Sequence, residues 1–350
     1  MSIVGLHHVT AICSDARRTV DFYTKILNLR LVKKTVNFDD PGVYHLYFGD
    51  DTGKPGTLIT FFEWKRLSRG NYGVGTTQRI SFAVDSYEAL LKWKRWLIDH
   101  GVEIKGPYDR TYYRTIYFHD PDGLQLEIAT SGPGWTVDED PDNLGMQSIT
   151  PHEGVLPSER REVSAAAINW QGSIKTFTPD MGIRRLHHIT AISSNMERTA
   201  TFYTEVLNFR VFKKTFSYDD LSIPHFYFGS EDGKPGSIVS YVEFAGQRNL
   251  RGKIGIGMVH HFAFGVENED IQMEWRNTLL KNHIDVTPVQ ERLYFKSIYF
   301  HDPDGHILEI ATLNPGFLVD EPADRLGKEL QLPPWLSDRR NKLEKTLIPI

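Results

Sequence analysis

The 350-residue sequence has a single cysteine, Cys13, and no long apolar run. One cysteine cannot form an intrachain disulfide, and such low cysteine usage fits a reducing compartment. No segment approaches the roughly 20 consecutive apolar residues of a membrane-spanning helix. The first residues, MSIVGLHHVT, lack the charged start and apolar stretch of a secretory signal. We therefore expect a cytoplasmic protein that has no membrane partner.

The sequence also lacks a cluster of basic residues. It has 40 Lys and Arg against 45 Asp and Glu, a formal net charge of −5, so we expect no nucleic-acid partner. Apolar residues make up 40% and charged residues 24% of the chain, which is the ordinary balance of a globular protein. A chain of this length can form two domains, each with its own core.

One long unit is written twice in the sequence. LHHVTAICSDARRTVDFYTKILNLRLVKKT, from Leu6, matches LHHITAISSNMERTATFYTEVLNFRVFKKT, from Leu186. RTYYRTIYFHDPDGLQLEIAT, from Arg110, matches RLYFKSIYFHDPDGHILEIAT, from Arg292. Such self-similarity is the first evidence to use in dividing a sequence into domains. We predict a first repeat at residues 1–145, a linker at 146–183, a second repeat at 184–328 and a C-terminal tail at 329–350.

Each repeat divides again into two modules with one order of elements. In the first module a short strand precedes DARRTVDFYTKIL, whose apolar spacing predicts a helix with Asp15 as its N-cap. In the second, SYEALLKWKRWLIDHG predicts a helix capped by Ser86 and ended by Gly101. Strands separated by Gly, Pro and Asp turns follow each helix. We predict an α+β fold of four βαβββ modules, at 4–65, 77–131, 184–245 and 258–313, that form two domains of curved, mostly antiparallel sheets.

The last module carries the residue types of a metal site. Its first strand reads VHHFAFGV and its last strand LEIAT, which contain His261 and Glu309. Alternate side chains of a strand share one face, so two strands around a concave surface can aim an imidazole and a carboxylate at one point. A second histidine from LHHVT or LHHIT, which is His8 or His188, would complete the two-histidine, one-carboxylate triad of non-haem Fe(II) oxygenases. The residues alone do not show whether His8 or His188 is the second histidine ligand.

The second module serves as an internal control for this site. It has Arg79 and Glu127 at the positions of His261 and Glu309. Arginine has no lone pair to offer a metal, so we predict a salt bridge between Arg79 and Glu127 that closes this second site. The acids of the DPDG turns and the lysines of the KKT strands are interpreted as solvated.

At these residues the chain resembles a known family. LHHVTA, YHLYFGDDTGKPGT, the second HH strand and YFHDPDGHILEIAT are similar to motifs of the hydroquinone-type ring-cleaving dioxygenases. These enzymes belong to the vicinal oxygen chelate superfamily, with glyoxalase I, extradiol dioxygenases and bleomycin-resistance proteins. The resemblance covers the chain to about residue 320. It implies Fe(II) as the cofactor, O2 and a hydroquinone-type or catechol-type aromatic diol as substrates, and leaves room for a homo-oligomer.

The resemblance also implies roles for individual residues. Its metal ligands would be His8, His261 and Glu309, with module one packed against module four and module two against module three. A sequential pairing of modules would use His188 in place of His8. The residues that it implies around the ligands and the substrate are His7, Thr10, His260, Arg292 and Tyr299. Donors behind the ligands orient them, and a cation and a phenol stabilise a bound phenolate.

Two rival functions stay open on the sequence alone. A glyoxalase-like isomerase that uses Zn²⁺ or Ni²⁺ would need a fourth ligand, and Thr60 or Ser240 stands where that ligand is expected. A non-catalytic sequestering protein of the resistance type needs no metal triad, so the pairing of His261 with Glu309 argues against it. We therefore predict an Fe(II)-dependent ring-cleaving dioxygenase.

Overall fold

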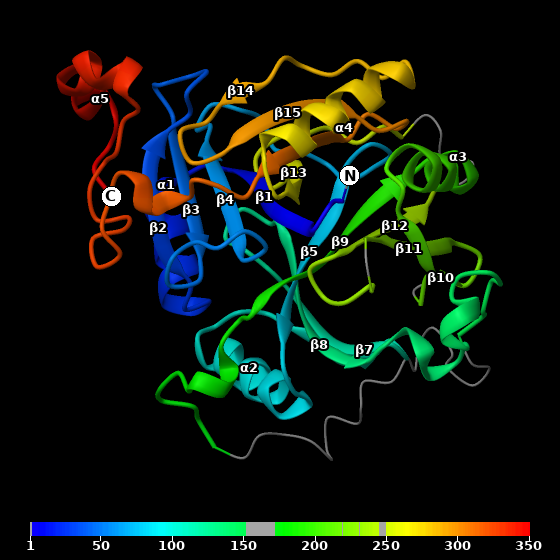
Figure 1. The fold of residues 1–350 in the computed structure, drawn as a ribbon. Helices are drawn as coiled ribbons and strands as arrows, with labels where there is room; N and C mark the ends of the chain where they lie inside the picture. The colour runs from blue at the N-terminus through cyan, green and yellow to red at the C-terminus, as the bar shows by residue number, and fades with distance from the viewer. Residues whose placement is uncertain (1, 152–171, 219, 231, 245–249) are drawn as a thin grey trace.

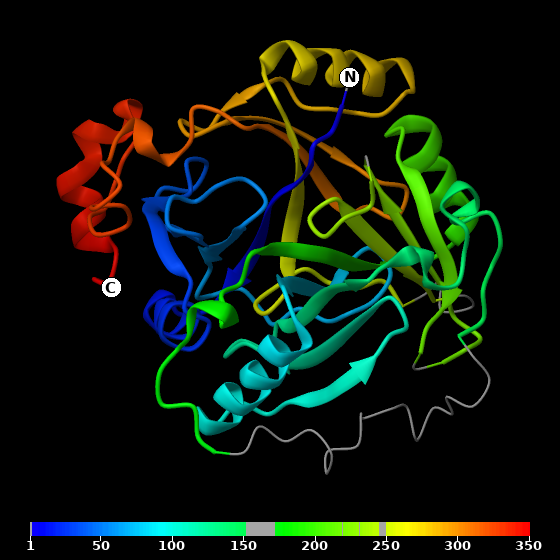
Figure 2. The ribbon, with the colours of Figure 1, turned by 60° about the horizontal axis from the view of Figure 1, so that its bottom comes forward.

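The computed structural model describes residues 2–151, 172–218, 220–230, 232–244 and 250–350. Its strands form two curved sheets of eight strands each, with helices on their outer sides (Figures 1 and 2). Both sheets are mixed, and most neighbouring strands are antiparallel. The predicted α+β class is confirmed. Most of the predicted linker falls at 152–171, outside the described residues.

Four strands belong to each module. In the first half of the chain they are β1 (Gly5–Cys13), β2 (Arg30–Val36), β3 (Tyr44–Gly49), β4 (Leu58–Glu63), β5 (Thr77–Val84), β6 (Lys105–Asp109), β7 (Tyr113–His119) and β8 (Gln125–Pro133). In the second half they are β9 (Arg185–Ser193), β10 (Arg210–Phe216), β11 (Pro224–Gly229), β12 (Ile238–Glu243), β13 (Val259–Val266), β14 (Gln290–Glu291), β15 (Lys296–His301) and β16 (Ile307–Thr312).

One α-helix follows the first strand of each module. These are α1 (Ala16–Asp21), α2 (Tyr87–Asp99), α3 (Met196–Thr201) and α4 (Glu269–Lys281); α5 (Arg340–Thr346) lies near the C-terminus. α1 and α3 continue into π-helical turns at Phe22–Ile26 and Phe202–Val206, and short 3₁₀ helices lie at Trp135–Val137, Pro141–Asn143, Pro179–Met181, Phe317–Val319 and Pro334–Arg339. The predicted caps are present, since Asp15 accepts from the backbone N–H of Arg18 and Ser86 from that of Ala89. Among the described helices, none has the length and apolarity needed to cross a membrane.

Each sheet combines strands from both repeats. Sheet I has the order β14-β15-β16-β13-β1-β4-β3-β2, and sheet II has the order β10-β11-β12-β9-β5-β8-β7-β6. β1 pairs antiparallel with β13 at the centre of sheet I, and β5 pairs with β9 in the same way in sheet II (Figure 1). Modules one and four therefore build sheet I, and modules two and three build sheet II.

The acids of the DPDG turns connect the two sheets. Asp122, in the turn before β8, accepts hydrogen bonds from the backbone and side chain of Ser14 and from Arg18, which lie beside β1. Asp304 makes the same contacts with Ser194 and Arg198. Asp122 and Asp304 are buried, so the interpretation of these turns as solvated is wrong. A buried carboxylate needs such donors, and here the donors come from the opposite sheet.

The first lysine of each KKT strand is also buried. Lys33 on β2 forms ion pairs with Asp320 and Glu321, and Lys213 on β10 forms them with Asp138 and Glu139. Both lysine side chains have no exposed surface, so the solvated interpretation is wrong for them too. Asp320 and Glu321 follow β16, and Asp138 and Glu139 follow β8. These ion pairs therefore fix the segment after β16 to the edge strand β2 of sheet I, and the segment after β8 to the edge strand β10 of sheet II.

Candidate metal centre

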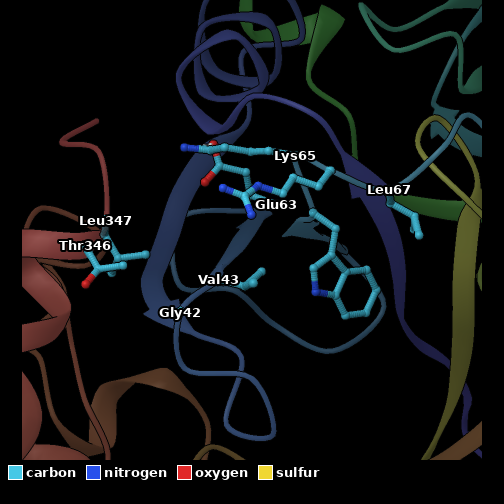
Figure 3. A pocket seen from close by; sticks show the side chains of 9 residues that line it. Gly42, Val43, Glu63, Lys65, Leu67, Thr346 and Leu347 are labelled. Carbon is cyan, nitrogen blue, oxygen red and sulfur yellow. Dashed lines mark ion pairs between the residues drawn. The ribbon is translucent and has the colours of Figure 1, made fainter.

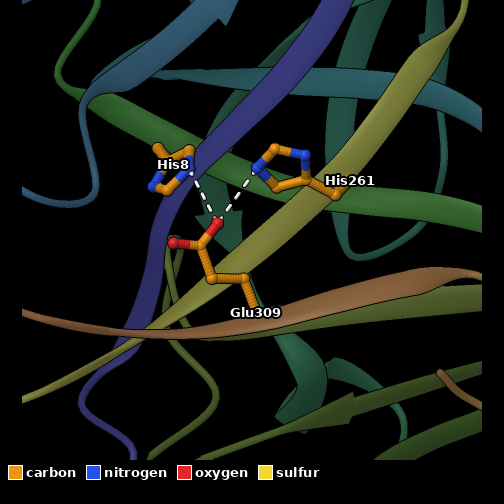
Figure 4. Close-up of side chains that lie close together, drawn as sticks. All are labelled: His8, His261 and Glu309. Atoms are coloured by element: carbon orange, nitrogen blue, oxygen red, sulfur yellow. Dashed lines mark ion pairs between the residues drawn. The ribbon is translucent and has the colours of Figure 1, made fainter. Parts of the chain in front are cut away.

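Three side chains from three neighbouring strands of sheet I converge at one point. His8 lies on β1, His261 on β13 and Glu309 on β16. The Nε2 atom of His8 is 3.2 Å, and that of His261 is 3.0 Å, from Oε2 of Glu309 (Figure 4). All three residues are buried, and their potential ligand atoms lie within 4.8 Å of one another. In the described part of the chain, this is the one such cluster of three.

The carboxylate of Glu309 has one satisfied and one unsatisfied oxygen. Oε1 accepts a hydrogen bond from Ser297. Oε2 is buried and, among the described residues, has no hydrogen-bond partner, although Nε2 of both histidines lies close to it. An unsatisfied buried carboxylate oxygen is costly, and a cation held between it and the two imidazoles would remove that cost. The donor set is the two-histidine, one-carboxylate set of a divalent iron site, so the residues fit that metal.

A second histidine stands behind each of the two inner ones. Nδ1 of His7 is 2.9 Å from Nδ1 of His8, and Nδ1 of His260 is 2.8 Å from Nδ1 of His261. Burial, helped by the neighbouring inner histidine, lowers the pKa of His7 and of His260 to about 3, so both are neutral.

These contacts define which nitrogen of His8 carries the proton. Nε2 of His7 lies 3.2 Å from the carbonyl oxygen of Thr312 and can only donate to it. Nδ1 of His7 is then an acceptor, so Nδ1–H of His8 donates to it. Nε2 of His8 is left with a free lone pair that faces Glu309, which is the state that a metal requires.

The other three predicted residues occupy different places. Arg292 and Tyr299 line the pocket over the cluster, and the Arg292 guanidinium lies 5.5 Å from the centre of the Tyr299 ring. Burial, followed by the charge of Glu309, raises the pKa of Tyr299, so it keeps its proton. Thr10 lies on β1 and hydrogen-bonds to Thr60, 2.8 Å away, instead of lining the pocket.

Several pocket residues were missed from the sequence. The pocket is lined by His8, Asn37, Phe38, Asp39, His45, Tyr47, Phe62, His261, Arg292, Phe295 and Tyr299. His45 is held on both sides, with Nε2 3.0 Å from Oγ1 of Thr60 and Nδ1 3.0 Å from the hydroxyl of Tyr47. YHLYFG in module one and PHFYFG in module three share this His and Tyr. The repetition of this His and Tyr is a signal from which His45 and Tyr47 could have been found.

A larger pocket of about 570 Å³ lies beside the candidate centre without sharing a lining residue with it. Figure 3 shows it between Val43, Glu63 and Lys65 of module one and the C-terminal Thr346 and Leu347. Trp64 forms part of its wall, and the Trp64 ring lies 5.5 Å from that of His260.

Sheet II presents the equivalent residues with different contacts. Glu127 accepts hydrogen bonds from Thr115, at 2.6 Å, and from Ser81 through Oε2. Arg79 donates to Gln78 at 3.0 Å and lies 5.0 Å from the centre of the Tyr117 ring. The predicted salt bridge between Arg79 and Glu127 is wrong, because hydroxyl groups satisfy this carboxylate.

Comparison with known proteins agrees with the fold. The model of the Glyoxalase/Bleomycin resistance protein/Dioxygenase superfamily matches residues 5–128 and 185–310. The chain belongs to this superfamily. The chain is 32% identical over 358 residues to "Putative ring-cleaving dioxygenase MhqO" of Bacillus subtilis (strain 168), covering 99% of this chain and 96% of that protein.

Two further relatives span nearly the whole chain. The chlorohydroquinone/hydroquinone 1,2-dioxygenase of Sphingobium indicum is 28% identical over 349 residues, which cover 99% of this chain and 96% of that one. A crystal structure described as a "putative dioxygenase" from Bacillus subtilis superposes with a TM-score of 0.80 at 31% identity, covering 100% of this chain and 98% of the other. The superfamily thus shares its fold with this chain over both repeats.

Proposed function

We propose that this protein is an Fe(II)-dependent ring-cleaving dioxygenase that opens a hydroquinone-type aromatic diol with O2. The observation that carries the proposal is the buried Oε2 of Glu309, which has no hydrogen bond and faces the Nε2 atoms of His8 and His261. The relatives named as ring-cleaving and hydroquinone dioxygenases support the choice of reaction. Bound iron would supply the redox chemistry that joins O2 to the ring, with open positions for both.

The protein side chains would bind and orient the reactants. His8, His261 and Glu309 would hold the metal, and Ser297 holds the carboxylate in place from behind. The rings of Phe38, Phe62 and Phe295 line the pocket and would exclude water around an aromatic substrate.

Arg292 and Tyr299 would act on the substrate oxygens. The guanidinium of Arg292 supplies positive charge beside the pocket, and Tyr299 supplies an O–H donor. Asp39 pairs with Arg292 at 2.9 Å and is 72% exposed, so this ion pair lies at the outer side of the pocket. A diol with one ionised oxygen would be held by the metal on one side and by these two groups on the other.

The alternative function that the sequence left open is a glyoxalase-like isomerase. That chemistry would need a fourth ligand, and the cluster in the described residues has three members. Thr60 bonds to Thr10 and His45, and Ser240 bonds to Thr190, so both hydroxyl groups are already engaged. The three-residue set favours the dioxygenase, because it leaves more positions open to substrate and O2.

The test uses protein purified without oxygen. We expect iron to bind, and O2 to be consumed when hydroquinone, chlorohydroquinone or catechol is added. His8→Ala should remove iron and activity, whereas the matched variant His188→Ala in sheet II should keep both. Iron-loaded protein that consumes no O2 with any of the three diols would refute the proposed reaction. Iron loss in His188→Ala with retention in His8→Ala would refute the ligand set.

A further inference from the structure

The concave face of sheet II holds a buried arginine with an unsatisfied donor. Arg79 occupies the position of His261 on the equivalent strand. Its Nε atom is buried and has no hydrogen-bond partner. The residue as a whole keeps some accessible surface, whereas His261 is buried. No ion pair joins Arg79 to Glu127 among the described residues, and the carboxylate of Glu127 accepts hydrogen bonds from Thr115 and Ser81.

Another buried side chain of sheet II is unsatisfied, and the sheet I counterparts of this residue and of Arg79, which are His45 and His261, line one pocket. His225 on β11 is buried, and its Nε2 has no hydrogen-bond partner. Its sheet I equivalent, His45, bonds through Nε2 to Thr60, whereas in sheet II Ser240 bonds to Thr190 instead. Burial, followed by the charge of Arg79, lowers the pKa of His225 well below its ordinary range, so the imidazole is neutral.

When Tyr113 donates to Tyr227, the hydroxyl hydrogen of Tyr227 is available to Nδ1 of His225. Nδ1 lies 3.4 Å from the hydroxyl of Tyr227, which can donate to it. The neutral ring then has its hydrogen on Nε2, so Nε2 is an unsatisfied donor like Nε of Arg79. Two buried donors, one of them charged, lack an acceptor on this face.

The surroundings of these donors are aromatic. Tyr113 replaces Phe295 of sheet I, and its hydroxyl is 3.1 Å from that of Tyr227. The Arg79 guanidinium lies over the Tyr117 ring, at 5.0 Å from its centre. A ligand here would meet tyrosine rings, hydroxyl groups and a guanidinium that favours planar oxyanions.

We propose that sheet II carries a metal-independent binding site for an aromatic monoanion, either a phenolate or a ring-bearing carboxylate, whose oxygens accept from Arg79 and His225. The positive charge of the Arg79 guanidinium would bind the anionic aromatic oxygen in sheet II, as a bound metal would in sheet I. Binding in sheet II would therefore need no metal. This site does not depend on the reaction proposed for sheet I.

Binding to the full chain tests this site. Benzoate is titrated by calorimetry before and after removal of metal with a chelator, with neutral benzamide as the control ligand. We expect one benzoate site per chain that survives chelation, and no binding of benzamide. A second arm uses 4-nitrophenol, whose absorbance reports ionisation; a phenolate site would bind the ionised form and lower its apparent pKa. Absence of both benzoate and 4-nitrophenolate binding to the metal-free chain would overturn the proposal.

Variants assign any binding to the proposed residues. Arg79→Gln should weaken binding at least tenfold and leave metal content unchanged. The matched variant His261→Gln in sheet I should lose metal and keep the anion site. Unchanged affinity in Arg79→Gln, or lost affinity in His261→Gln, would place the ligand elsewhere and refute the proposal. If Arg79→Gln does not fold, His225→Phe replaces it, with the same expected loss and the same refuting result.

Discussion

Sheets I and II have nearly the same backbone but treat the same glutamate in opposite ways. Glu309 in sheet I has an unsatisfied oxygen that faces two histidines, and Glu127 in sheet II has a hydroxyl donor on each oxygen. The residue that makes this difference is Ser81, because sheet I has Ala263 at the equivalent position. The two sheets thus differ in this serine as well as in the replacement of a histidine by arginine.

The proposed metal site of sheet I differs from sheet II in the number of hydrogen bonds that the buried carboxylate accepts. A buried carboxylate must be satisfied by hydrogen bonds or by a cation. In sheet II a single hydroxyl group supplies the missing hydrogen bond, so no cation is needed. In sheet I the apolar Ala263 leaves that oxygen open. Three variants test this difference between the two sheets.

The largest expected effect is a second metal site in sheet II. The variant Gln78→His/Arg79→His/Ser81→Ala gives sheet II the side chains of sheet I at these three positions. We expect iron content after anaerobic loading to rise from about one to about two per chain, because His188 and Glu127 are already in place. Metal analysis of the purified protein measures this. The same variant with Ser81 retained is the control and should bind the second metal more weakly.

Stoichiometry that stays at one iron in the triple variant would contradict this account of sheet II. It would mean that residues beyond these three positions prevent binding. His187 cannot be the cause, since its Nδ1 is 2.9 Å from Nδ1 of His188, as in sheet I.

A smaller effect is expected from the reverse change in sheet I. Ala263→Ser adds the hydroxyl group that Ser81 supplies in sheet II, so it should donate to Oε2 of Glu309 and compete with the metal. We expect roughly a 10–100-fold loss of metal affinity, as for other changes around a ligand. Competition with a coloured chelator measures it. Ser81→Ala, the matched change in sheet II, should leave the affinity of the sheet I metal unaltered; equal affinity in Ala263→Ser would refute the role of this position.

The smallest effect concerns stability in the turn before the last strand. His306 pairs with Asp302 at 2.7 Å in sheet I, and sheet II has Leu124 at the position of His306, beside Asp120. Burial raises the pKa of Asp120 to about 6. Burial acts the same way on Asp302, but the charge and hydrogen bonds of His306 and the hydrogen bond from Tyr241 together outweigh burial, so the pKa of Asp302 is lowered. Burial lowers the pKa of His306, but the charge and hydrogen bond of Asp302, together with Thr76 and Asp304, outweigh burial, so this pKa is raised.

His306→Leu should therefore destabilise the fold by about 1.5 kcal/mol, the low end for a hydrogen bond to a charged group, because Asp302 keeps the bond from Tyr241. A raised histidine pKa gives stability that is present below about pH 6.5 and lost as pH rises through the folded value. A lowered aspartate pKa gives stability that is present above about pH 3.9 and lost in acid. Denaturant unfolding should thus show the largest difference near pH 6; a difference that grows toward pH 9 would contradict this pairing.

Much of the fold followed from local sequence. The apolar spacing and the capping residues Asp15 and Ser86 predicted helices that the structure contains, because both signals act within a few residues. The environment of Lys33 and of the DPDG acids was predicted wrongly. Their partners, such as Glu321 for Lys33 and Ser14 for Asp122, lie far away in the chain, and short motifs do not report such contacts.

The residues of the candidate site were also predicted only in part from the sequence. His261 and Glu309 were predicted together because they lie on two strands of one module. His45 and Phe295 were missed, since a buried aromatic in a strand has the same local pattern whether it lines a core or a pocket. Ser81 was missed because its importance depends on its contact with Glu127, 46 residues away.

The sequence by itself determined that the chain is a repeat of four similar modules and that one strand pair retains a histidine and a glutamate where the other has Arg79. Only the tertiary structure decided which histidine joins them. His8 and His188 sit in nearly identical segments, and no local preference separates them. β1 pairs with β13, so His8 lies beside His261 and Glu309, while β9 pairs with β5 and takes His188 to Glu127. Strand pairing between distant modules is a long-range choice, made by the packing of whole sheets.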